Sequence, residues 1–418
     1  MHKLAVFTTI ALLCHMAMGQ DMTKVKQVVG DLSSKAFYGR GYINKGDSLA
    51  ADYIAHALKQ QRIKPLEKSY FQHFKMDINR YIGTPVLKID GKTLKNGIDW
   101  VPYPSSPSVH GKYPLVWITK KDLTHKKALT RLLNQDLKSS FITFDTSVTN
   151  NKELYWFARN LFTTQPLLVK GVVDRVKSPK FSARRYLSDY ITLRVRREFL
   201  SPEVNEIEVE LENEFLRDYT SQNVMGFIKG KTDTCITLIG HYDHMGMFGE
   251  AMYPGANDNA SGDAMILELG KYFKKHKPYY SIQLIFFGAE EAGFYGSEYY
   301  VAHPVYPLEK TKLVINFDMV ASGTKWTELI HAQLYPAIEK AFVNINDRKN
   351  YIEHLKPTGY EATSDHINFH DKGIPALFFW TAGGNEFYHE PGDLADTINY
   401  PSFEGIYNLV CEFIETYR

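Results

Sequence analysis

Short apolar runs alternate with helix-like segments in the second half of the chain. Candidate buried strands, each bounded by Gly, Pro or polar residues, lie at Cys235–Ile239, Ile282–Phe287, Leu313–Phe317 and Ile374–Phe379. Helical spacing predicts a helix from about Ser261 to Lys275 between the first two runs, and another from roughly Thr327 to Val343 between the last two. This alternation predicts an α/β fold, with a mostly parallel mixed sheet flanked by helices.

The stretch from about Arg80 to Asn205 has a different pattern. Short β-like runs alternate there with turn signals, at Pro85–Ile89, Tyr113–Ile118, Ser140–Phe144, Leu167–Val173 and Tyr190–Val195. A helix is predicted before this stretch, from Asp47 to Lys59. We therefore predict an inserted, mainly β domain over residues 81–205, placed between the core segments 20–80 and 206–418. The insert is expected to lie beside the functional cleft and to shape access to it.

Composition restricts the partners of the chain. The 418 residues are 44% hydrophobic and 14% aromatic, which is enough to bury a large core. The 49 basic and 47 acidic residues nearly cancel. This balance argues against nucleic acid or an anionic membrane surface as the main partner.

The first 19 residues have the pattern of a signal peptide. Lys3 supplies a positive start, an apolar run follows, and Ala17-Met18-Gly19 is a small-x-small cleavage site. The mature chain is therefore expected to start at Gln20 and to be secreted or periplasmic. The remaining cysteines, Cys235 and Cys411, lie in apolar runs and are expected to be buried thiols. No other segment is long and apolar enough to span a membrane.

Potential metal ligands follow three of the predicted strands directly. His241 and Asp243 come after the first strand, Glu290 and Glu291 after the second, and Asp318 after the third. In sheets of this kind, ligands bind outside the carboxyl ends of the strands. The three strand ends are therefore expected to bring these side chains together at one edge of the sheet.

Two further motifs complete the candidate set. Asp258 lies in Ala-Asn-Asp-Asn-Ala-Ser-Gly, and His389 lies in Tyr-His-Glu-Pro. Imidazole and carboxylate groups without cysteine are typical of a hydrolytic zinc site and not of a structural zinc finger. A pair of metals needs about five such side chains, one of them able to bridge. The sequence offers that number.

Each motif has an ordinary structural explanation when taken alone. Adjacent acids such as Glu290-Glu291 usually form a solvated turn, Asp258 could cap a helix, and His389 could be a plain loop histidine. The functional interpretation rests on the motifs occurring together in order on one framework of strands. His244 and His366 are weaker candidates, expected to lie on a loop wall and to act as a hydrogen-bonding group, respectively.

The ordered motif set resembles the M28 family of zinc metallopeptidases, the co-catalytic di-zinc aminopeptidases and their relatives. The resemblance covers roughly Asn223 to the C-terminus and the helical region near Arg40–Lys64. It implies a zinc exopeptidase-like fold with two zinc ions per chain. The insert loosely resembles the protease-associated domain of many relatives.

The resemblance also implies roles for the ligands. His241 resembles the histidine ligand of one zinc, and Asp258 resembles the carboxylate that bridges both. Glu291 and Asp318 resemble the carboxylate ligands of opposite zincs. His389 resembles the closing histidine.

Three more roles follow from the resemblance. Glu290 resembles the general base, and Tyr388 resembles a tyrosine that stabilises a developing oxyanion. Asp243 is similar to an acid that steadies the first histidine. The peptide bond between Asp258 and Asn259 is expected to be cis, as in relatives. The Glu-Pro-Gly-Asp sequence after His389 departs from the Thr-Pro of many relatives but leaves the ligand in place.

The sequence therefore predicts a secreted di-zinc exopeptidase acting on peptides, with an aminopeptidase as the leading version. Carboxypeptidase specificity within the same family stays open. Two other hypotheses are a glutaminyl-cyclase-like acyltransferase with a single zinc and a non-catalytic binding protein on the same scaffold.

Overall fold

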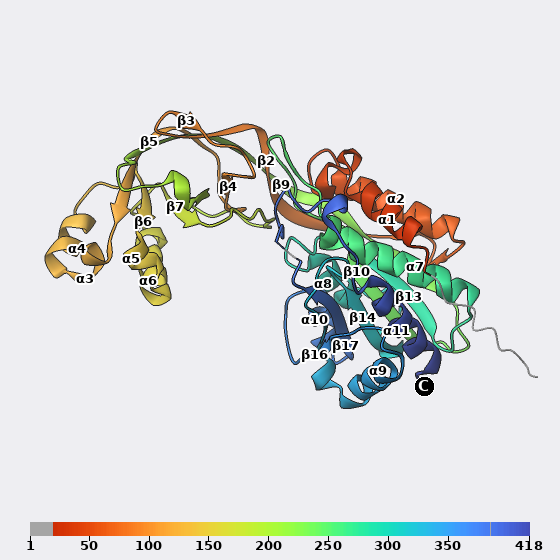
Figure 1. The fold of residues 1–418 in the computed structure, drawn as a ribbon. Helices are drawn as coiled ribbons and strands as arrows, with labels where there is room; N and C mark the ends of the chain where they lie inside the picture. Colours follow the sequence, from red (N-terminus) through yellow and green to blue (C-terminus); the bar gives the residue numbers. More distant parts are fainter. Residues whose placement is uncertain (1–19, 385) are drawn as a thin grey trace, which may run out of the picture.

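A mixed β-sheet forms the core of the protein, and an elongated lobe projects from it (Figure 1). The structure is a computed structural model that describes residues 20–384 and 386–418, so the predicted signal peptide lies outside the described residues. Four parallel strands occupy the centre in the order β17, β14, β10 and β13. They span Ala376–Ala382, Thr311–Phe317, Cys235–His241 and Ser281–Phe287.

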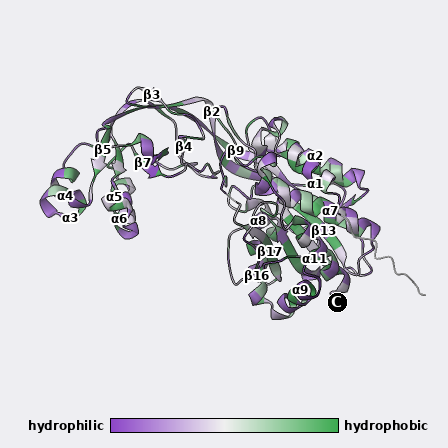
Figure 2. Cartoon of the chain, in the orientation of Figure 1, coloured by the Kyte–Doolittle hydropathy of each residue, from purple (hydrophilic) through white to green (hydrophobic). Residues whose placement is uncertain are grey.

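Helices cover both faces of this sheet. One face packs against the larger group, which consists of α1 (Met22–Leu32), α2 (Gly46–Gln60), α7 (Ser261–Lys275), α9 (Pro336–Lys349) and α11 (Phe403–Thr416). The opposite face packs against α8 (Tyr295–Ala302) and α10 (His366–His370). Because both faces are covered, the central strands are almost continuously apolar (Figure 2). The predicted α/β fold class is confirmed.

The four predicted core strands and the helix at Ser261–Lys275 are confirmed. The predicted helix from Thr327 to Val343 is wrong over its first half. Trp326–Ile330 instead forms strand β15, which pairs antiparallel with β17, and its other edge pairs with the short strand β16 (Leu355–Pro357). The helix α9 begins only at Pro336, where the proline lacks an N–H that a first-turn residue does not need.

Two long antiparallel strands join the core to the lobe. Strand β2 (Phe71–Ile89) pairs with β9 (Glu206–Ile228) along most of its length, and β9 also pairs with β13 of the core. The lobe continues this sheet with β5 (Val109–Ile118), β6 (Phe141–Phe144), β7 (Gly171–Val176), β8 (Ile191–Arg196) and β4 (Trp100–Pro102). It also contains four helices that the sequence pattern did not predict, α3 (Lys120–Thr124), α4 (Lys126–Leu133), α5 (Thr146–Thr149) and α6 (Lys152–Thr163).

An aromatic cluster packs the near part of the lobe against core loops. Phe181 of the lobe stacks on Tyr253 with ring centroids 5.1 Å apart, and Trp100 meets the edge of Phe248 at the same centroid distance. These contacts fix the lobe close to the carboxyl ends of the central strands. Among the described residues, no helix combines the length and apolar character needed to cross a membrane.

Candidate metal centre

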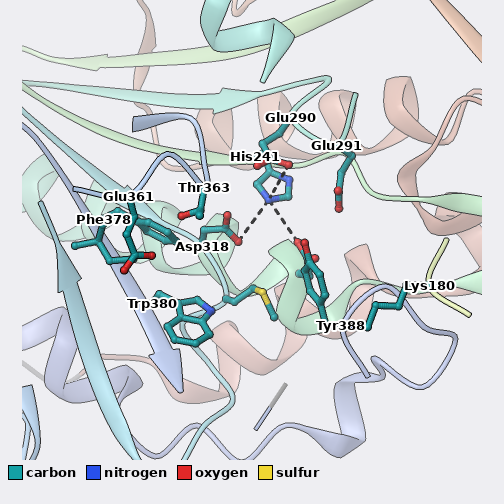
Figure 3. Close-up of a pocket in the computed structure, with 13 residues that line it drawn as sticks. Lys180, His241, Glu290, Glu291, Asp318, Glu361, Thr363, Phe378, Trp380 and Tyr388 are labelled. Atoms are coloured by element: carbon teal, nitrogen blue, oxygen red, sulfur yellow. Dashed lines mark ion pairs between the residues drawn. The ribbon is translucent and has the colours of Figure 1, made fainter. Parts of the chain in front are cut away.

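The structure brings the predicted ligands together at the carboxyl edge of the sheet, and Figure 3 shows His241, Glu291 and Asp318 among them. His241 is the last residue of β10, Glu291 lies in the turn after β13, and Asp318 directly follows β14. Asp258 lies in a short irregular helical turn, Ala256–Ala260, that leads into α7, and His389 lies in the loop after β17. All five side chains are buried.

His241 faces one oxygen of Asp258. The His241 Nε2 atom lies 3.4 Å from Asp258 Oδ1 and 3.5 Å from Asp318 Oδ1. Glu290 Oε2 is farther away, at 3.9 Å from the same nitrogen. The shorter distances group His241 with Asp258 and Asp318.

His389 faces the other oxygen of Asp258. The His389 Nε2 atom lies 3.3 Å from Asp258 Oδ2 and 3.3 Å from Glu291 Oε2. Asp258 therefore presents one carboxylate oxygen to each of two neighbouring groups of ligands. The peptide bond between Asp258 and Asn259 is cis, as predicted.

The donor atoms of these two groups fit metal ions. Asp318 Oδ1 and His389 Nε2 are buried and have no hydrogen-bond partner in the described part of the chain. Buried polar atoms without partners are costly unless a ligand satisfies them. Two imidazoles and three carboxylates, without any thiolate, suit zinc. Ligand atoms of His241, Asp258 and Glu291 lie within 4.8 Å of one another, as do those of His241, Glu290 and Asp318.

The adjacent acids Glu290 and Glu291 have opposite electrostatic environments. Burial raises the pKa of Glu290 well above its usual value, and the nearby carboxylate of Glu291 raises it further against the opposing effect of His241. Burial also opposes ionisation of Glu291, but His389 and His244 together hold its pKa well below the usual value. Glu291 therefore stays ionised beside the histidines, while Glu290 is the better proton acceptor and donor of the pair.

Asp243 organises the turn that carries these two acids. Its carboxylate accepts hydrogen bonds from the backbone amides of Glu290 (3.0 Å) and Glu291 (3.4 Å). The Tyr42 hydroxyl donates a third hydrogen bond to it at 3.1 Å. The predicted contact with His241 is made mainly by the backbone, because His241 Nδ1 lies 3.1 Å from the Asp243 carbonyl oxygen and 3.8 Å from its carboxylate. That backbone contact orients the His241 ring.

Two side chains that the sequence analysis did not assign hold the ligands from outside. The Asp393 carboxylate accepts hydrogen bonds from the backbone amides of Asn257 (2.9 Å) and Asp258 (3.0 Å). The Ser364 hydroxyl donates a hydrogen bond of 2.8 Å to Asp318 Oδ2. Asp393 follows His389 by four residues in the same motif, so its role near the site could have been predicted from the sequence. The role of Ser364 could not, because only the tertiary fold brings it to the site.

Arg40 is a third supporting residue. Its fully buried guanidinium donates to the backbone carbonyls of Tyr242 (2.7 Å), Pro254 (2.6 Å), Gly255 (2.7 Å) and Asp258 (3.0 Å). Burial lowers its pKa, and the charges of nearby aspartates oppose that effect. Arg40 thereby ties the chain after His241 to the turn that presents Asp258.

The two weaker histidine candidates have different positions. His244 is fully buried and its Nδ1 lies 2.8 Å from Glu291 Oε1, so it orients a ligand. His366 is also fully buried, but its Nε2 lies 2.9 Å from the carbonyl oxygen of Glu361. His366 therefore supports the wall of the site and does not touch the assigned ligands.

A cavity of about 340 Å³ opens above the ligands. Its apolar wall is formed by Met319, Ile330, Phe378 and Trp380, and Glu361 adds a carboxylate (Figure 3). Tyr388 also lines it, stacked on His389 with ring centroids 3.7 Å apart. Burial and the neighbouring carboxylates raise the pKa of Tyr388 above its usual value, so its hydroxyl keeps its proton and can donate a hydrogen bond.

The lobe reaches this cavity through one segment. Lys180 lines the cavity, and its Nζ lies 4.8 Å above the centre of the Tyr388 ring. The backbone amide of Phe181 donates to the carbonyl oxygen of His389 at 3.3 Å. None of the five assigned ligands comes from the lobe.

The arrangement of strands, helices and lobe is that of the solved zinc aminopeptidases. BSAP, a zinc aminopeptidase from Bacillus subtilis, matches with a TM-score of 0.69 and 19% identity over 96% of this chain and 97% of that chain. A peptidase M28 precursor from Shewanella amazonensis matches with a TM-score of 0.63 and 17% identity over 95% of this chain and 97% of that chain. At these identities the likeness establishes the fold.

Sequence comparison relates the second half of the chain to a known family. Residues 223–414 match the model of peptidase family M28. The segment is similar to aminopeptidase YwaD of Bacillus subtilis, at 32% identity over 49% of this chain and 46% of the relative. It is also similar to leucine aminopeptidase 2 of Arthroderma otae, at 28% identity over 48% of this chain and 46% of the relative. The match thus spans less than half the length of these two relatives. Over residues 223–414 the chain is therefore similar to the M28 peptidases.

Proposed function

We propose that this protein is a di-zinc aminopeptidase that removes N-terminal residues from peptides. The observation that carries the proposal is the position of Asp258, whose Oδ1 lies 3.4 Å from His241 Nε2 and whose Oδ2 lies 3.3 Å from His389 Nε2. A carboxylate shared in this way is typical of a two-metal hydrolytic site. The predicted signal peptide adds the proposal that the protein works outside the cytoplasm.

The ligands divide into two sets that share Asp258. His241 and Asp318 would hold one zinc together with Asp258, and Glu291 and His389 would hold the other. Bound zinc would acidify a water molecule and polarise the scissile carbonyl. His244 and Ser364 would keep Glu291 and Asp318 in the orientation that ligation needs.

Glu290 and Tyr388 perform the proton and hydrogen-bond steps. Glu290 accepts the proton of the attacking water and passes it to the leaving amine, and the raised pKa of its buried carboxyl accords with both transfers. The protonated Tyr388 hydroxyl faces the same cavity and donates a hydrogen bond to the developing oxyanion. Both residues line the cavity that holds the ligands.

The shape of the cavity suits the N-terminal residue of a peptide. Its volume of about 340 Å³ is in the range of small-ligand sites. The side chain of that residue would pack against Ile330, Phe378 and Trp380. The carboxylates at the floor of the cavity would attract the free α-amino group.

A substrate panel tests the proposal. Aminoacyl chromogenic substrates, unblocked peptides and their N-acetylated counterparts are assayed with zinc, with chelator, and after restoring zinc. We expect hydrolysis of unblocked substrates only, loss with chelator, recovery with zinc, and two zincs per chain by elemental analysis. Cyclisation of N-terminal Gln peptides with one zinc per chain would instead identify an acyltransferase. Absence of turnover in the zinc-loaded protein would favour a binding protein.

A further inference from the structure

The lobe contains a second and larger cavity beside the metal centre. Its volume is about 620 Å³. Cationic and aromatic side chains dominate its wall, and we call it the arginine cavity. Its charged and aromatic lining residues are Arg159, Arg175, Lys180, Arg194, Asp174, Tyr103, Phe144, Tyr155, Trp156, Tyr186 and Tyr190.

The arginine cavity has an excess of positive charge. Arg159 is neutralised, because its guanidinium contacts both oxygens of Asp174, at 2.8 and 2.9 Å. Arg175, Lys180 and Arg194 form no ion pair with any described residue. The Nε atom of Arg175 is also buried and has no hydrogen-bond partner in the described part of the chain. Arg175 and Arg194 are partly buried, and partly buried cations without counter-charges are costly unless an anion lies near them, whereas Lys180 is exposed.

Aromatic rings hold two of these cations in place. The Arg194 guanidinium lies 4.7 Å from the centre of the Tyr103 ring, which lines the cavity. The Arg175 guanidinium lies 5.2 Å from the centre of the Trp117 ring and donates to the carbonyl oxygen of Leu200 at 3.3 Å, and neither of these two residues lines the cavity. Planar guanidinium groups fixed in this way match carboxylates through paired hydrogen bonds. Trp156 is 49% exposed, so apolar surface is available beside the cations.

A single segment connects the arginine cavity to the metal centre. Lys180 lines both cavities. Its carbonyl oxygen accepts a hydrogen bond of 3.0 Å from Arg194 Nη1, and its Nζ lies over the Tyr388 ring. Figure 3 shows Lys180 beside Tyr388 at the metal-centre cavity, and Lys180 also lines the arginine cavity together with Arg194, so a chain that enters the metal centre by its N-terminus can continue past Lys180 toward Arg194.

We propose that the arginine cavity binds carboxylate groups in the downstream part of a peptide, so that the protein prefers peptides with acidic residues beyond their N-terminal end. The direction of the peptide, with its N-terminus at the metal centre, rests on the proposed peptidase function. The choice of carboxylate as the bound group rests only on the residues that line the arginine cavity. A peptide fits better than a small free anion, because the cavity combines spaced cations with aromatic walls and adjoins the metal centre.

Calorimetric binding to the zinc-loaded full-length protein tests this proposal. The probes are an N-acetylated ten-residue peptide with Glu residues in its second half and the same peptide with Gln in their place. Acetylation prevents removal of the first residue, so binding is measured without turnover. We expect the Glu peptide to bind about tenfold more tightly, the scale of one charge-assisted hydrogen bond.

Two variants locate the binding. Arg194→Gln and Arg175→Gln should each reduce the preference for the Glu peptide. The control is Arg217→Gln, because Arg217 is an exposed arginine of the joining strand β9, 3.4 Å from Asp77 and outside the cavity, and this variant should keep the preference. Circular dichroism shows which variants are folded. Equal binding of both peptides by the wild type, or an unchanged preference in folded Arg194→Gln and Arg175→Gln proteins, would overturn the proposal.

Two further results separate the proposal from its alternatives. If inorganic phosphate binds as tightly as the Glu peptide and displaces it, the cavity is a general anion site and the peptide proposal is wrong. If the Glu peptide binds as expected but no unblocked peptide is hydrolysed, the arginine cavity is supported and the peptidase function fails.

Discussion

The carboxylate of Asp243 accepts a hydrogen bond from the backbone amide of Glu290 at 3.0 Å, while its own carbonyl oxygen lies 3.1 Å from Nδ1 of His241. One residue therefore fixes the position of both the proposed base and a ligand on a neighbouring strand. Burial raises the pKa of Asp243 to about 7, and the charge of His241 opposes that shift.

Asp243→Asn should separate these two tasks. The asparagine keeps the backbone contact to His241. Its NH₂ group, however, would face one of the two backbone amides that donate hydrogen bonds to the Asp243 carboxylate in the wild type. We expect turnover of an aminoacyl substrate to fall by about 10- to 100-fold, the usual effect of losing a partner outside the ligand set. Tyr42→Phe is the control, because it removes only the neighbouring hydroxyl and should have a smaller effect. Equal losses in the two variants would contradict the assignment.

Glu290→Gln removes the proposed proton acceptor without changing its size. Turnover should fall by roughly 100-fold or more, the scale of general acid–base catalysis, with both zincs still bound. Steady-state kinetics and elemental analysis on the same preparation check this. The control is Glu298→Gln, an exposed acid on α8, which should behave like the wild type. Near-normal turnover in metal-loaded Glu290→Gln would exclude Glu290 as the base.

Asp258→Ala and His389→Ala should lose different amounts of metal. Asp258 faces both histidines, so its removal should lower zinc occupancy at both positions after dialysis. His389 contacts only the Asp258 and Glu291 side of the centre, so its removal should weaken mainly one zinc. Zinc per chain is measured at a series of free zinc concentrations. Two tightly held zincs in Asp258→Ala would rule out the shared ligand.

His366 should make the protein less stable in acid. Burial, reinforced by His331, lowers its pKa to about 3, so the folded state holds it neutral while the unfolded state protonates it near pH 6.5. The unfolded state therefore binds more protons between these values. The contribution of His366 to the free energy of unfolding is fully present above about pH 6.5. It is lost as pH falls toward 3, by roughly 1.4 kcal/mol per pH unit.

The comparison with a variant isolates this effect from the titration of carboxyl groups. The free energy of unfolding of the wild type should fall more steeply with acid than that of His366→Gln. His354→Gln replaces an exposed histidine and should follow the wild type. Parallel curves for the wild type and His366→Gln would show that His366 is not the responsible group.

Arg40→Lys should destabilise the protein and loosen the metal centre together. A lysine ammonium cannot replace the several N–H groups of the guanidinium, which donate to the carbonyls of Tyr242, Pro254, Gly255 and Asp258. Each buried carbonyl left without a hydrogen bond costs about 1–3 kcal/mol. Differential scanning calorimetry should show a clear fall in the unfolding temperature, and zinc affinity should fall in parallel. Arg217→Lys, at an exposed position, should change neither.

Three of the ligands could be predicted because they lie at or just after the ends of regular strands. His241, Glu291 and Asp318 could be assigned because apolar runs fixed three strand ends, and parallel strands place those ends at one edge. Asp258 and His389 were found by their motifs, which local residues define. All five lie together in the structure as the sequence analysis expected.

Contacts that depend on tertiary structure could not be read in advance. Arg40 lies about 200 residues from the carbonyls that it binds, at a sequence separation of 202 from Tyr242. The apolar residues of Trp326–Ile330 fit both the helical and the strand period, so the sequence pattern alone did not exclude a helix. The strand conformation forms because this segment pairs with the edge of β17. Three of the four lobe helices have eight residues or fewer, which is too short for a helical period to be recognised, while α6 has twelve residues and was missed.

The long pair of strands β2 and β9 has a consequence for how the lobe can move and be altered. The pairing runs from Phe71 to Ile89 with register irregularities between Met76 and Ile78 and between Ile82 and Val86. A lobe attached by such a ladder is held more stiffly than a module on a flexible linker, and the two irregularities mark where the paired strands are locally distorted. A cut at residue 81 would fall within β2, whereas a cut at residue 205 would leave all of β9 in place without its partner, so truncation should instead shorten β2 and β9 together, in register.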